Sequence, residues 1–396
     1  MQTRLEKKWK CIWCEQNMNK NEKWSAQIAR IGQDAMSTTG RLQRVKLKGF
    51  KSIQKMDLEL APLNILIGSN GAGKSNFINF FKFMNKLLDK ELQLYVRSQL
   101  NGADRTLYFG RKTTEKLDID LRFDFNGYQA TLIPTTNDTF VFETENALFY
   151  DNNNHKNENH TLSFGGEFES SIREFSGSTI TEWIRLYLTD AKPYHFHDTS
   201  DTAKVKTSYS IHANNRLMAQ GENLAAFLYN VRETTAYKKI VRTIQRVAPF
   251  FHDFIFEIEA NEMIRLRWKH KGSDDYFDAT MLSDGTLRFI CLTTLLLQPN
   301  LPTIILLDEP ELGLHPFAMQ LLAAMMRSAS EQTQIIASTQ SVTLANQFSW
   351  EDIVVVDQID NASNFRRLKE AEVTAWLEEY KIGDIWEMNA MGGTPE

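Results

Sequence analysis

A glycine-rich run followed by lysine and serine is the first group of residues that could do chemistry. The run matches the pattern GxxxxGK[ST]. Its members are Gly68, Ser69, Asn70, Gly71, Ala72, Gly73, Lys74 and Ser75, and Asn76 follows them. Glycines let several backbone N–H groups surround phosphate oxygens, and the N-terminus of a following helix adds a positive dipole end. The pattern predicts a phosphate-binding loop in which Lys74 reaches the terminal phosphates and the Ser75 hydroxyl binds magnesium.

Two acidic residues at the end of an apolar run form a second group. Residues 303–307 read TIILL, and Asp308 and Glu309 come directly after them. A strand of this composition is expected to be buried, so unpaired acids at its tip would be costly as purely structural residues. Carboxylates in this position suit a magnesium ligand, Asp308, and a base that activates water, Glu309.

Two shorter polar segments accompany the loop and the acids. Ser283 and Gly285 lie in MLSDGTLRF, at the start of an apolar helix expected to continue to about residue 297. They expose backbone groups suited to phosphate, although LSDG is weak evidence by itself. Gln340 lies in the segment STQS, directly after a strand expected at 334–337.

The apolar spacing predicts the elements that position these groups. Residues 64–67 are expected to form a buried strand. A helix is expected to begin at residue 77 and, through residue 82, to run on to about residue 100. A hairpin with its turn at residues 49–52 precedes them. Further strands are expected at 117–125 and 128–134, joined by a turn at Asn126-Gly127, and at 139–149, 254–268 and 353–356. Further helices are expected at 180–188, 222–248, 317–328 and 373–380, and a polar surface loop at 151–160.

Composition limits the class of protein. The 396 residues are 42% hydrophobic and 24% charged, which is ordinary for a soluble globular protein. No stretch is apolar enough to predict a membrane span, and three cysteines give no disulfide framework, which favours the cytoplasm. Cys11 and Cys14 form half of a zinc ribbon within residues 1–40, where a loosely held appendage is the alternative interpretation.

Two further clusters each have two interpretations. The segment from Arg41 to Lys55 holds six basic residues and no acid, so it is either a nucleic-acid edge or a solvated strand face. The net charge of −5 requires any nucleic-acid contact to be a local patch. His195 and His197 could bind metal, but burial between core helices is the favoured interpretation.

Read together, these motifs resemble the ABC-type ATPase heads of the SMC and RecF-like group, in particular compact AAA proteins related to the OLD type. The resemblance covers residues 41 to about 390 and rests on GSNGAGKS, LSDGT, ILLDEPE and GLHP. It implies an α/β fold with a mixed β-sheet, an antiparallel β-subdomain and a helical insertion subdomain. The expected head spans 41–396, with lobes at 41–135, 136–275 and 276–396.

The resemblance also implies a function. Such heads form ATP-sandwich homodimers with Mg²⁺, so Ser283 and Gly285 would face a nucleotide held by the other subunit. Gln340 stands where the group often carries histidine; an amide can hydrogen-bond a γ-phosphate but cannot become cationic. The residues after Gln340 are too few for the Toprim nuclease domain of OLD-type proteins, so any nucleolysis is expected from a separate protein.

We therefore expect a cytoplasmic, Mg²⁺-dependent ATPase that couples ATP to DNA, in RecF-like repair or in phage defence. The alternative is a nucleotide-gated switch that binds a separately encoded effector protein, a toxin or a nuclease, and turns over little ATP. A zinc-dependent nucleic-acid enzyme that uses the cysteine pair and the two histidines is a weaker third hypothesis. No membrane partner is expected.

Overall fold

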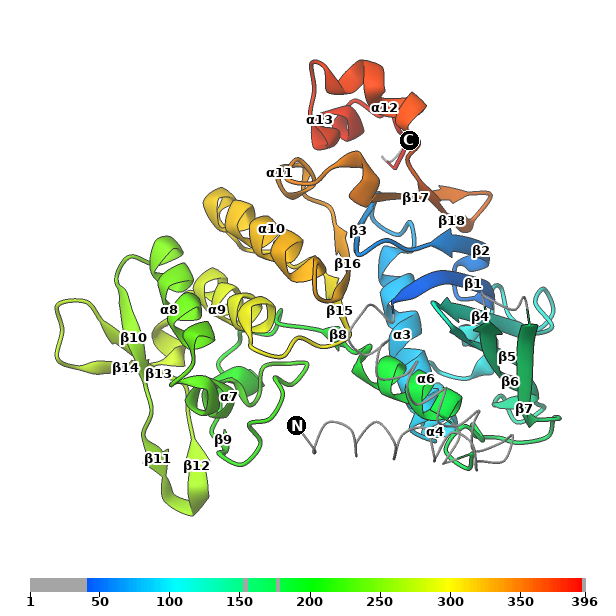
Figure 1. The fold of residues 1–396 in the computed structure, drawn as a ribbon, viewed down its shortest axis with the longest axis horizontal. Helices are drawn as coiled ribbons and strands as arrows, with labels where there is room; N and C mark the ends of the chain where they lie inside the picture. The colour runs from blue at the N-terminus through cyan, green and yellow to red at the C-terminus, as the bar shows by residue number, and fades with distance from the viewer. Residues whose placement is uncertain (1–40, 152–155, 176–178, 394–396) are drawn as a thin grey trace, which may run out of the picture.

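The computed structural model describes residues 41–151, 156–175 and 179–393 (Figure 1). The expected appendage over residues 1–40, with Cys11 and Cys14, lies outside this part of the chain. Within the described ranges, none of the helices has the length and apolar character needed to cross a membrane.

A six-stranded sheet in the middle of the molecule carries the phosphate loop. Its strand order is β18 (Ala362–Arg367), β17 (Ile353–Ile359), β3 (Leu63–Ile67), β16 (Gln334–Thr339), β15 (Ile304–Asp308) and β8 (Pro193–Tyr194). All neighbours are parallel except β17 and β18. Every residue of β3 is buried, as expected for a central parallel strand covered on both faces. The carboxyl ends of β3, β15 and β16 therefore meet at one edge of the sheet.

A second sheet is wholly antiparallel and follows the order β2-β1-β4-β5-β6-β7. Its strands are β1 (Leu42–Phe50), β2 (Ile53–Glu59), β4 (Leu117–Phe123), β5 (Asn126–Pro134), β6 (Phe140–Asp151) and β7 (Lys156–Ser163). Apolar and charged residues alternate along β1 and β2, so one face is buried and the other meets solvent. The expected lobe boundary at residue 135 falls inside this sheet, because β5 and β6 pair across it.

Helix α3 (Lys74–Leu88) joins the two sheets into one core. Its phenylalanines are buried, and Phe50 of β1 contacts the rings of Phe80 and Phe83 at centroid distances of 5.8 and 5.6 Å. Three further helices complete this half: α4 (Leu92–Gln99), α5 (Ala103–Thr106) and α6 (Thr179–Asp190).

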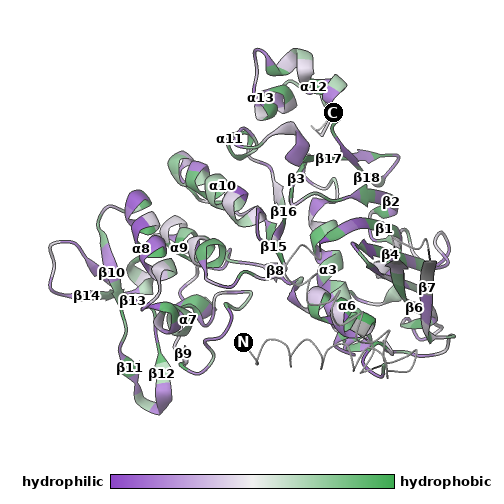
Figure 2. Cartoon of the chain, in the orientation of Figure 1, coloured by the Kyte–Doolittle hydropathy of each residue, from purple (hydrophilic) through white to green (hydrophobic). Residues whose placement is uncertain are grey.

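The other face of the central sheet is covered by helices that form a second core. The helices of this core are α9 (Asp284–Leu297), α10 (Pro316–Ser330), α11 (Val342–Ala345), α12 (Glu370–Leu377) and α13 (Ile382–Glu387), together with α7 (Leu224–Val231) and α8 (Thr235–Val247). Helix α10 contacts β3 and β16, whereas α8 packs against α9, farther from the central sheet. Figure 2 shows hydrophilic and hydrophobic residues alternating along α8. Two small sheets flank α7 and α8: β10 (Phe251–Ile255), β13 (Arg267–His270) and β14 (Tyr276–Asp278), and β11 (Ile258–Glu259), β12 (Met263–Ile264) and β9 (Tyr209–Ser210).

Two long helices expected from the sequence are each broken. The expected helix at 82–100 ends at Leu88, because Lys90 adopts a left-handed φ of 59° and a new helix starts at Leu92. The expected helix at 222–248 is divided at 232–234, where the Thr234 side chain accepts a hydrogen bond from the Tyr237 N–H and caps α8. Apolar periodicity continued across both breaks, so it did not reveal them.

Two expectations about the antiparallel sheet are also wrong. The turn between β4 and β5 lies at residues 124–125, and Gly127 pairs with Leu148 instead. A Cβ at Gly127 would lie 2.9 Å from the Tyr150 ring, so close packing explains this glycine. The expected loop at 151–160 contains the start of β7, which pairs with β6. Polar residues suit β7 because it is the edge strand of the sheet.

Candidate nucleotide site

The phosphate loop runs from Gly68 to Gly73, between β3 and α3, as the sequence predicts. Gly71 and Gly73 have φ values of 80° and 112°, which L-residues rarely adopt. Close packing adds a second constraint. A Cβ added at Gly68 would lie 2.2 Å from the Val356 carbonyl oxygen, and a Cβ added at Gly73 would lie 2.0 Å from the Ser363 hydroxyl oxygen. Strands β17 and β18 therefore support the loop from behind.

Lys74 points back into the loop. Its ammonium group donates hydrogen bonds to the carbonyl oxygens of Gly68 at 2.6 Å and Ser69 at 2.9 Å. The residue is only 5% exposed. Burial lowers the pKa of this ammonium, and the nearby acids, Glu309 first among them, oppose that shift. A lysine held inside a glycine-rich loop at the start of a helix suits the binding of a polyphosphate.

Ser75 and Asp308 meet although they are far apart in the sequence. The Ser75 hydroxyl donates to Asp308 Oδ1 at 3.2 Å, and the Ser338 hydroxyl donates to the same oxygen. Asp308 and Ser338 are partners in the register of β15 and β16. One hydroxyl and one carboxylate oxygen fit Mg²⁺, which takes one or two carboxylates and completes its shell with water and substrate phosphates. The described residues contain no cluster of three or more His, Cys, Asp or Glu suited to a metal.

Glu309 and Gln340 are also brought together. The Gln340 side-chain amide donates to Glu309 Oε1. Glu309 has a left-handed φ of 47°, and its N–H donates to the Ser338 carbonyl oxygen at 3.1 Å, so the backbone after β15 is fixed by β16. The general base and the switch residue expected from the sequence, Glu309 and Gln340, thus lie side by side, next to the Ser75–Asp308 pair.

Glu311 was not singled out from the sequence, although it completes the segment DEPE. It is buried, and one carboxylate oxygen accepts hydrogen bonds from the Thr339 hydroxyl and the Gln340 N–H. The other oxygen has no hydrogen-bond partner among the described residues. Burial raises the pKa of this carboxyl group. Glu311 holds the start of the Gln340 segment in place, so it acts on the site through that segment.

Ser283 and Gly285 lie at the start of α9. Ser283 is exposed and caps α9 by accepting from the Thr286 N–H at 3.3 Å. A Cβ on Gly285 would meet the Gly313 carbonyl oxygen at 2.4 Å, so this glycine allows the segment after Glu311 to pack against α9. No hydrogen bond between described residues joins Ser283 or Gly285 to the phosphate loop.

His197 and Arg288 connect α9 to the acidic strand, which the sequence did not reveal. His197 Nε2 lies 2.7 Å from the Asp308 carbonyl oxygen, which can only accept, so Nε2 carries the proton. Arg288 donates to the His197 and Leu312 carbonyl oxygens, each at 2.8 Å. His197 Nδ1 and Arg288 Nε are buried and have no partner in the described part of the chain. The histidine cluster therefore lies beside the site, at the end of the central sheet, and not between core helices.

The basic segment from Arg41 to Lys55 is partly neutralised. Arg44 forms a two-pronged ion pair with Asp57, at 2.5 and 2.7 Å. Arg41 donates to two backbone carbonyl oxygens at the end of α10. Lys48 and Lys55 remain exposed and lie opposite each other across the hairpin. The cationic character is thus concentrated at the turn end of the hairpin, beside Lys51.

Solved structures with a similar fold are SMC heads. A crystal structure of the SmcHead bound to the C-winged helix domain of ScpA matches with a TM-score of 0.52 and 14% identity, over 84% of this chain and 99% of that one. An Smc head with an extended coiled coil, bound to the C-terminal domain of ScpA derived from Pyrococcus furiosus, gives a TM-score of 0.47 and 15% identity, over 85% and 98%. The first similarity, together with the mixed sheet and the phosphate loop, defines a compact P-loop protein with the fold of an SMC-type ATPase head.

Sequence comparison gives the family. Residues 63–346, well over half of the chain, match the family described as "AAA domain, putative AbiEii toxin, Type IV TA system", and the chain belongs to that family. Endonuclease GajA from Bacillus cereus (strain VD045) is 28% identical over 89 residues, which are 22% of this chain and 14% of GajA. The chain thus matches only a small part of that relative's length. The expected resemblance to compact SMC-type heads related to the OLD group is confirmed.

Proposed function

We propose that the protein is a Mg²⁺-dependent ATPase. One observation carries this proposal: the phosphate loop, the Ser75–Asp308 pair and the Glu309–Gln340 pair converge from three strands on one sheet edge. This arrangement supplies a phosphate cradle, two oxygen ligands for Mg²⁺ and a carboxylate that can accept a proton from water.

The proposed roles follow from the contacts. The N–H groups of Gly68 to Asn76 bind the phosphates, and Lys74 moves from its loop carbonyls to the terminal phosphates. Ser75 and Asp308 hold Mg²⁺, which neutralises charge on the phosphates. Glu309 accepts the proton of the attacking water, and the Gln340 amide orients that water or the γ-phosphate. The carboxylate and the amide need little movement, because they already contact each other.

We further propose that two copies form an ATP sandwich, with residues 41–396 acting as one head. Ser283 is exposed at the N-terminus of α9, where it could meet a nucleotide held by a second copy. Apolar side chains near it are also exposed: Met281 is 70%, Leu312 48% and Phe317 40% accessible. Burial of this surface against a second copy would stabilise the dimer.

Coupling to DNA in the cytoplasm is the function we favour, in repair or in phage defence. The partial similarity to a protein named an endonuclease supports a nucleic-acid partner. The alternative, a nucleotide-gated switch on a separate effector protein, is supported by the SMC head that was solved with ScpA bound and by the toxin–antitoxin description of the family.

Steady-state ATP turnover tests the proposal. We expect turnover with Mg²⁺, loss of turnover with a chelator, and stimulation by duplex DNA. Turnover without any response to DNA would favour the protein-partner alternative. A parent protein that neither binds nor hydrolyses ATP in the presence of Mg²⁺ would contradict the ATPase itself.

A further inference from the structure

An open pocket of about 700 Å³ lies beside the turn end of the β1–β2 hairpin. Lys51, Asn101, Asp104, Arg105 and Phe109 are among the residues that line it, and we refer to it as the Phe109 pocket. None of the proposed nucleotide-binding residues lines it. The pocket is thus a separate feature of the molecule.

Three residues of the Phe109 pocket other than glycine have left-handed backbone conformations. The φ values are 48° at Lys51, 57° at Asn101 and 53° at Phe109. Asparagine adopts this conformation with little strain, whereas lysine and especially the bulky phenylalanine do so rarely. Strained residues of this kind concentrate at binding sites, where the surrounding structure holds them in place.

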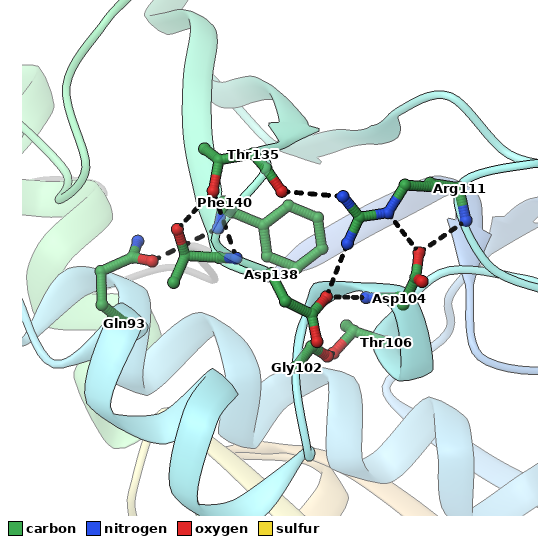
Figure 3. Close-up of polar contacts among 9 residues, drawn as sticks. Gln93, Gly102, Asp104, Thr106, Arg111, Thr135, Asp138 and Phe140 are labelled. Carbon is green, nitrogen blue, oxygen red and sulfur yellow. Dashed lines mark hydrogen bonds and ion pairs between the residues drawn. The ribbon is translucent and has the colours of Figure 1, made fainter.

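A network of polar contacts holds the wall of the pocket (Figure 3). Arg111 donates to Asp104 at 2.8 Å, to Asp138 at 2.9 Å and to the Thr135 carbonyl oxygen at 2.9 Å. The Asp104 N–H donates to Asp138 at 2.9 Å. These bonds join residues 104–111 to the connection between β5 and β6, so the strained segment is fixed before any ligand arrives.

The hairpin is joined to the same wall. The Lys51 N–H donates to the Thr106 carbonyl oxygen at 2.8 Å, and the Tyr108 N–H donates to the Gly49 carbonyl oxygen at 3.1 Å. The position of Lys51 relative to Phe109 is therefore set by backbone hydrogen bonds on both sides of the pocket.

Phe109 presents its ring to solvent. The residue is 65% exposed. The centroids of the Tyr108 and Phe109 rings lie 4.7 Å apart, and the two ring planes make an angle of 78°. An edge-to-face neighbour restrains the ring without covering both of its faces. A large apolar residue held in a strained conformation and left exposed has no evident role in the stability of the fold.

The charges around the ring are unbalanced. Asp104 is committed to Arg111, whereas Arg105 is exposed. The Lys51 ammonium is half-buried, and burial, with the nearby Lys82, lowers its pKa. Lys48 and Lys55 face each other at the same end of the hairpin, and Asp118 of β4 lies opposite Lys48 on the other side of β1. The lining of the pocket itself carries two cations, Lys51 and Arg105, and one acid, Asp104.

We propose that the Phe109 pocket binds unpaired nucleotides of a nucleic-acid strand, with one base stacked on Phe109 and the adjoining phosphates bound by Lys51 and Arg105. The combination of an exposed aromatic ring with cations is how proteins hold single strands without reading sequence. Duplex DNA offers its phosphates but not its base faces, so an unpaired segment or a frayed end is the better ligand. This inference rests on the nucleic-acid part of the proposed function.

Phe109→Asn is the decisive variant. Asparagine tolerates the left-handed conformation, so it removes the ring while relieving strain, and the variant should be at least as stable as the parent. We expect its affinity for a fluorescein-labelled oligothymidine, measured by anisotropy at low salt, to fall about tenfold or more. Phe109→Trp should retain binding because it keeps a stacking face.

Arg105→Glu addresses the phosphate contacts. It should weaken binding of all oligonucleotide sequences alike and should reduce the slope of log affinity against log salt by about one. Phe164→Asn is the matched control, because Phe164 is 91% exposed on the same half of the molecule but does not line the pocket. It should bind like the parent.

The outcomes separate this proposal from the ATPase. A parent that hydrolyses ATP but binds oligothymidine no better than the Phe109→Asn variant would overturn the pocket proposal alone. A parent that binds oligothymidine through Phe109 but never hydrolyses ATP would overturn the ATPase alone. Tighter binding of blunt duplex than of the single strand, unaffected by Phe109→Asn, would also overturn base stacking. If no nucleic acid binds, the pocket proposal fails and a protein becomes the candidate occupant.

Discussion

The phosphate-loop side of the site and the α9 side differ in which parts of the chain supply the hydrogen-bond partners of their polar side chains. Lys74 hydrogen-bonds to the carbonyl oxygens of its own loop, whereas Ser75 and Glu309 hydrogen-bond to residues at the ends of other strands of the sheet. The Ser283 side chain hydrogen-bonds to Thr286 of its own helix, and the residue is exposed. The first half of the site is assembled by folding, whereas the second half is presented outward. This difference supports our proposal that a second copy completes the site.

Arg288 links the two halves within one chain. Its guanidinium binds the His197 carbonyl oxygen on one side and the Leu312 carbonyl oxygen on the other, while His197 binds the Asp308 backbone. A shift of β15, which carries Asp308, would therefore also move the start of α9. The two halves are structurally different but not independent.

Removal of the proposed base should have the largest effect on the assembled half. In Glu309→Gln, the amide can still bind water but cannot accept its proton, so turnover should fall on the order of 10²–10⁴-fold. ATP binding should persist, and the trapped nucleotide should hold the dimer together. Turnover is checked by steady-state assay, and mass by light scattering with ATP. An unchanged monomer mass with ATP bound would contradict the sandwich mechanism.

Lys74→Ala should damage the same half at its phosphate cradle. Loss of the buried cation should reduce turnover on the order of 10²–10³-fold and should also weaken ATP binding. Binding is measured with a fluorescent ATP analogue and compared with Lys86→Ala, an exposed-side lysine on the same helix that pairs with Glu91. Hydrolysis at the parental rate would show that the loop is not the nucleotide site.

Ser283→Arg tests the outward half. The larger side chain should obstruct the contact with a second copy, and overpacking of this kind costs roughly 1–3 kcal/mol, about tenfold or more in dimer affinity. Dimerisation and turnover should fall together, whereas ATP binding by the phosphate loop should remain. A parallel loss of ATP binding would place Ser283 in the site of its own chain.

Glu311→Gln should have the smallest effect of these variants. It should change the stability of the fold, by an amount that depends on pH. Burial raises the pKa of Glu311 in the folded state, so the folded protein binds this proton more tightly than the unfolded chain does, and stability falls as pH rises through that range. The neutral amide keeps one oxygen for Thr339 and the Gln340 N–H. At pH 8 we expect the variant to melt higher than the parent, by about 2 °C. The difference should vanish below the ordinary pKa of glutamate, and a larger gain in acid would contradict this account.

Much of the fold was predictable where the information is local. The strand–loop–helix around Lys74 and the strand before Asp308 were located correctly, because a glycine turn and a buried parallel strand leave clear marks in the sequence. The helix breaks at Lys90 and Thr234 were missed, because apolar spacing continues across them. The edge strand β7 was taken for a loop, because an exposed edge strand and a surface loop share a polar composition.

The sequence by itself determined which chemical groups the protein has and the order in which they occur: a glycine-rich loop with a lysine, two acids after a buried strand, and a serine at the start of an apolar helix. Only the tertiary structure decided which of these groups meet. Strand order brings Ser75 to Asp308 and Gln340 to Glu309, and the packing of α9 joins Arg288 to His197. It also sets Phe109 beside Lys51, in backbone conformations that no sequence pattern indicated. The physical reason is that a motif records the conformation and burial that a short stretch of backbone requires, whereas contacts between distant segments depend on how the sheets and helices pack.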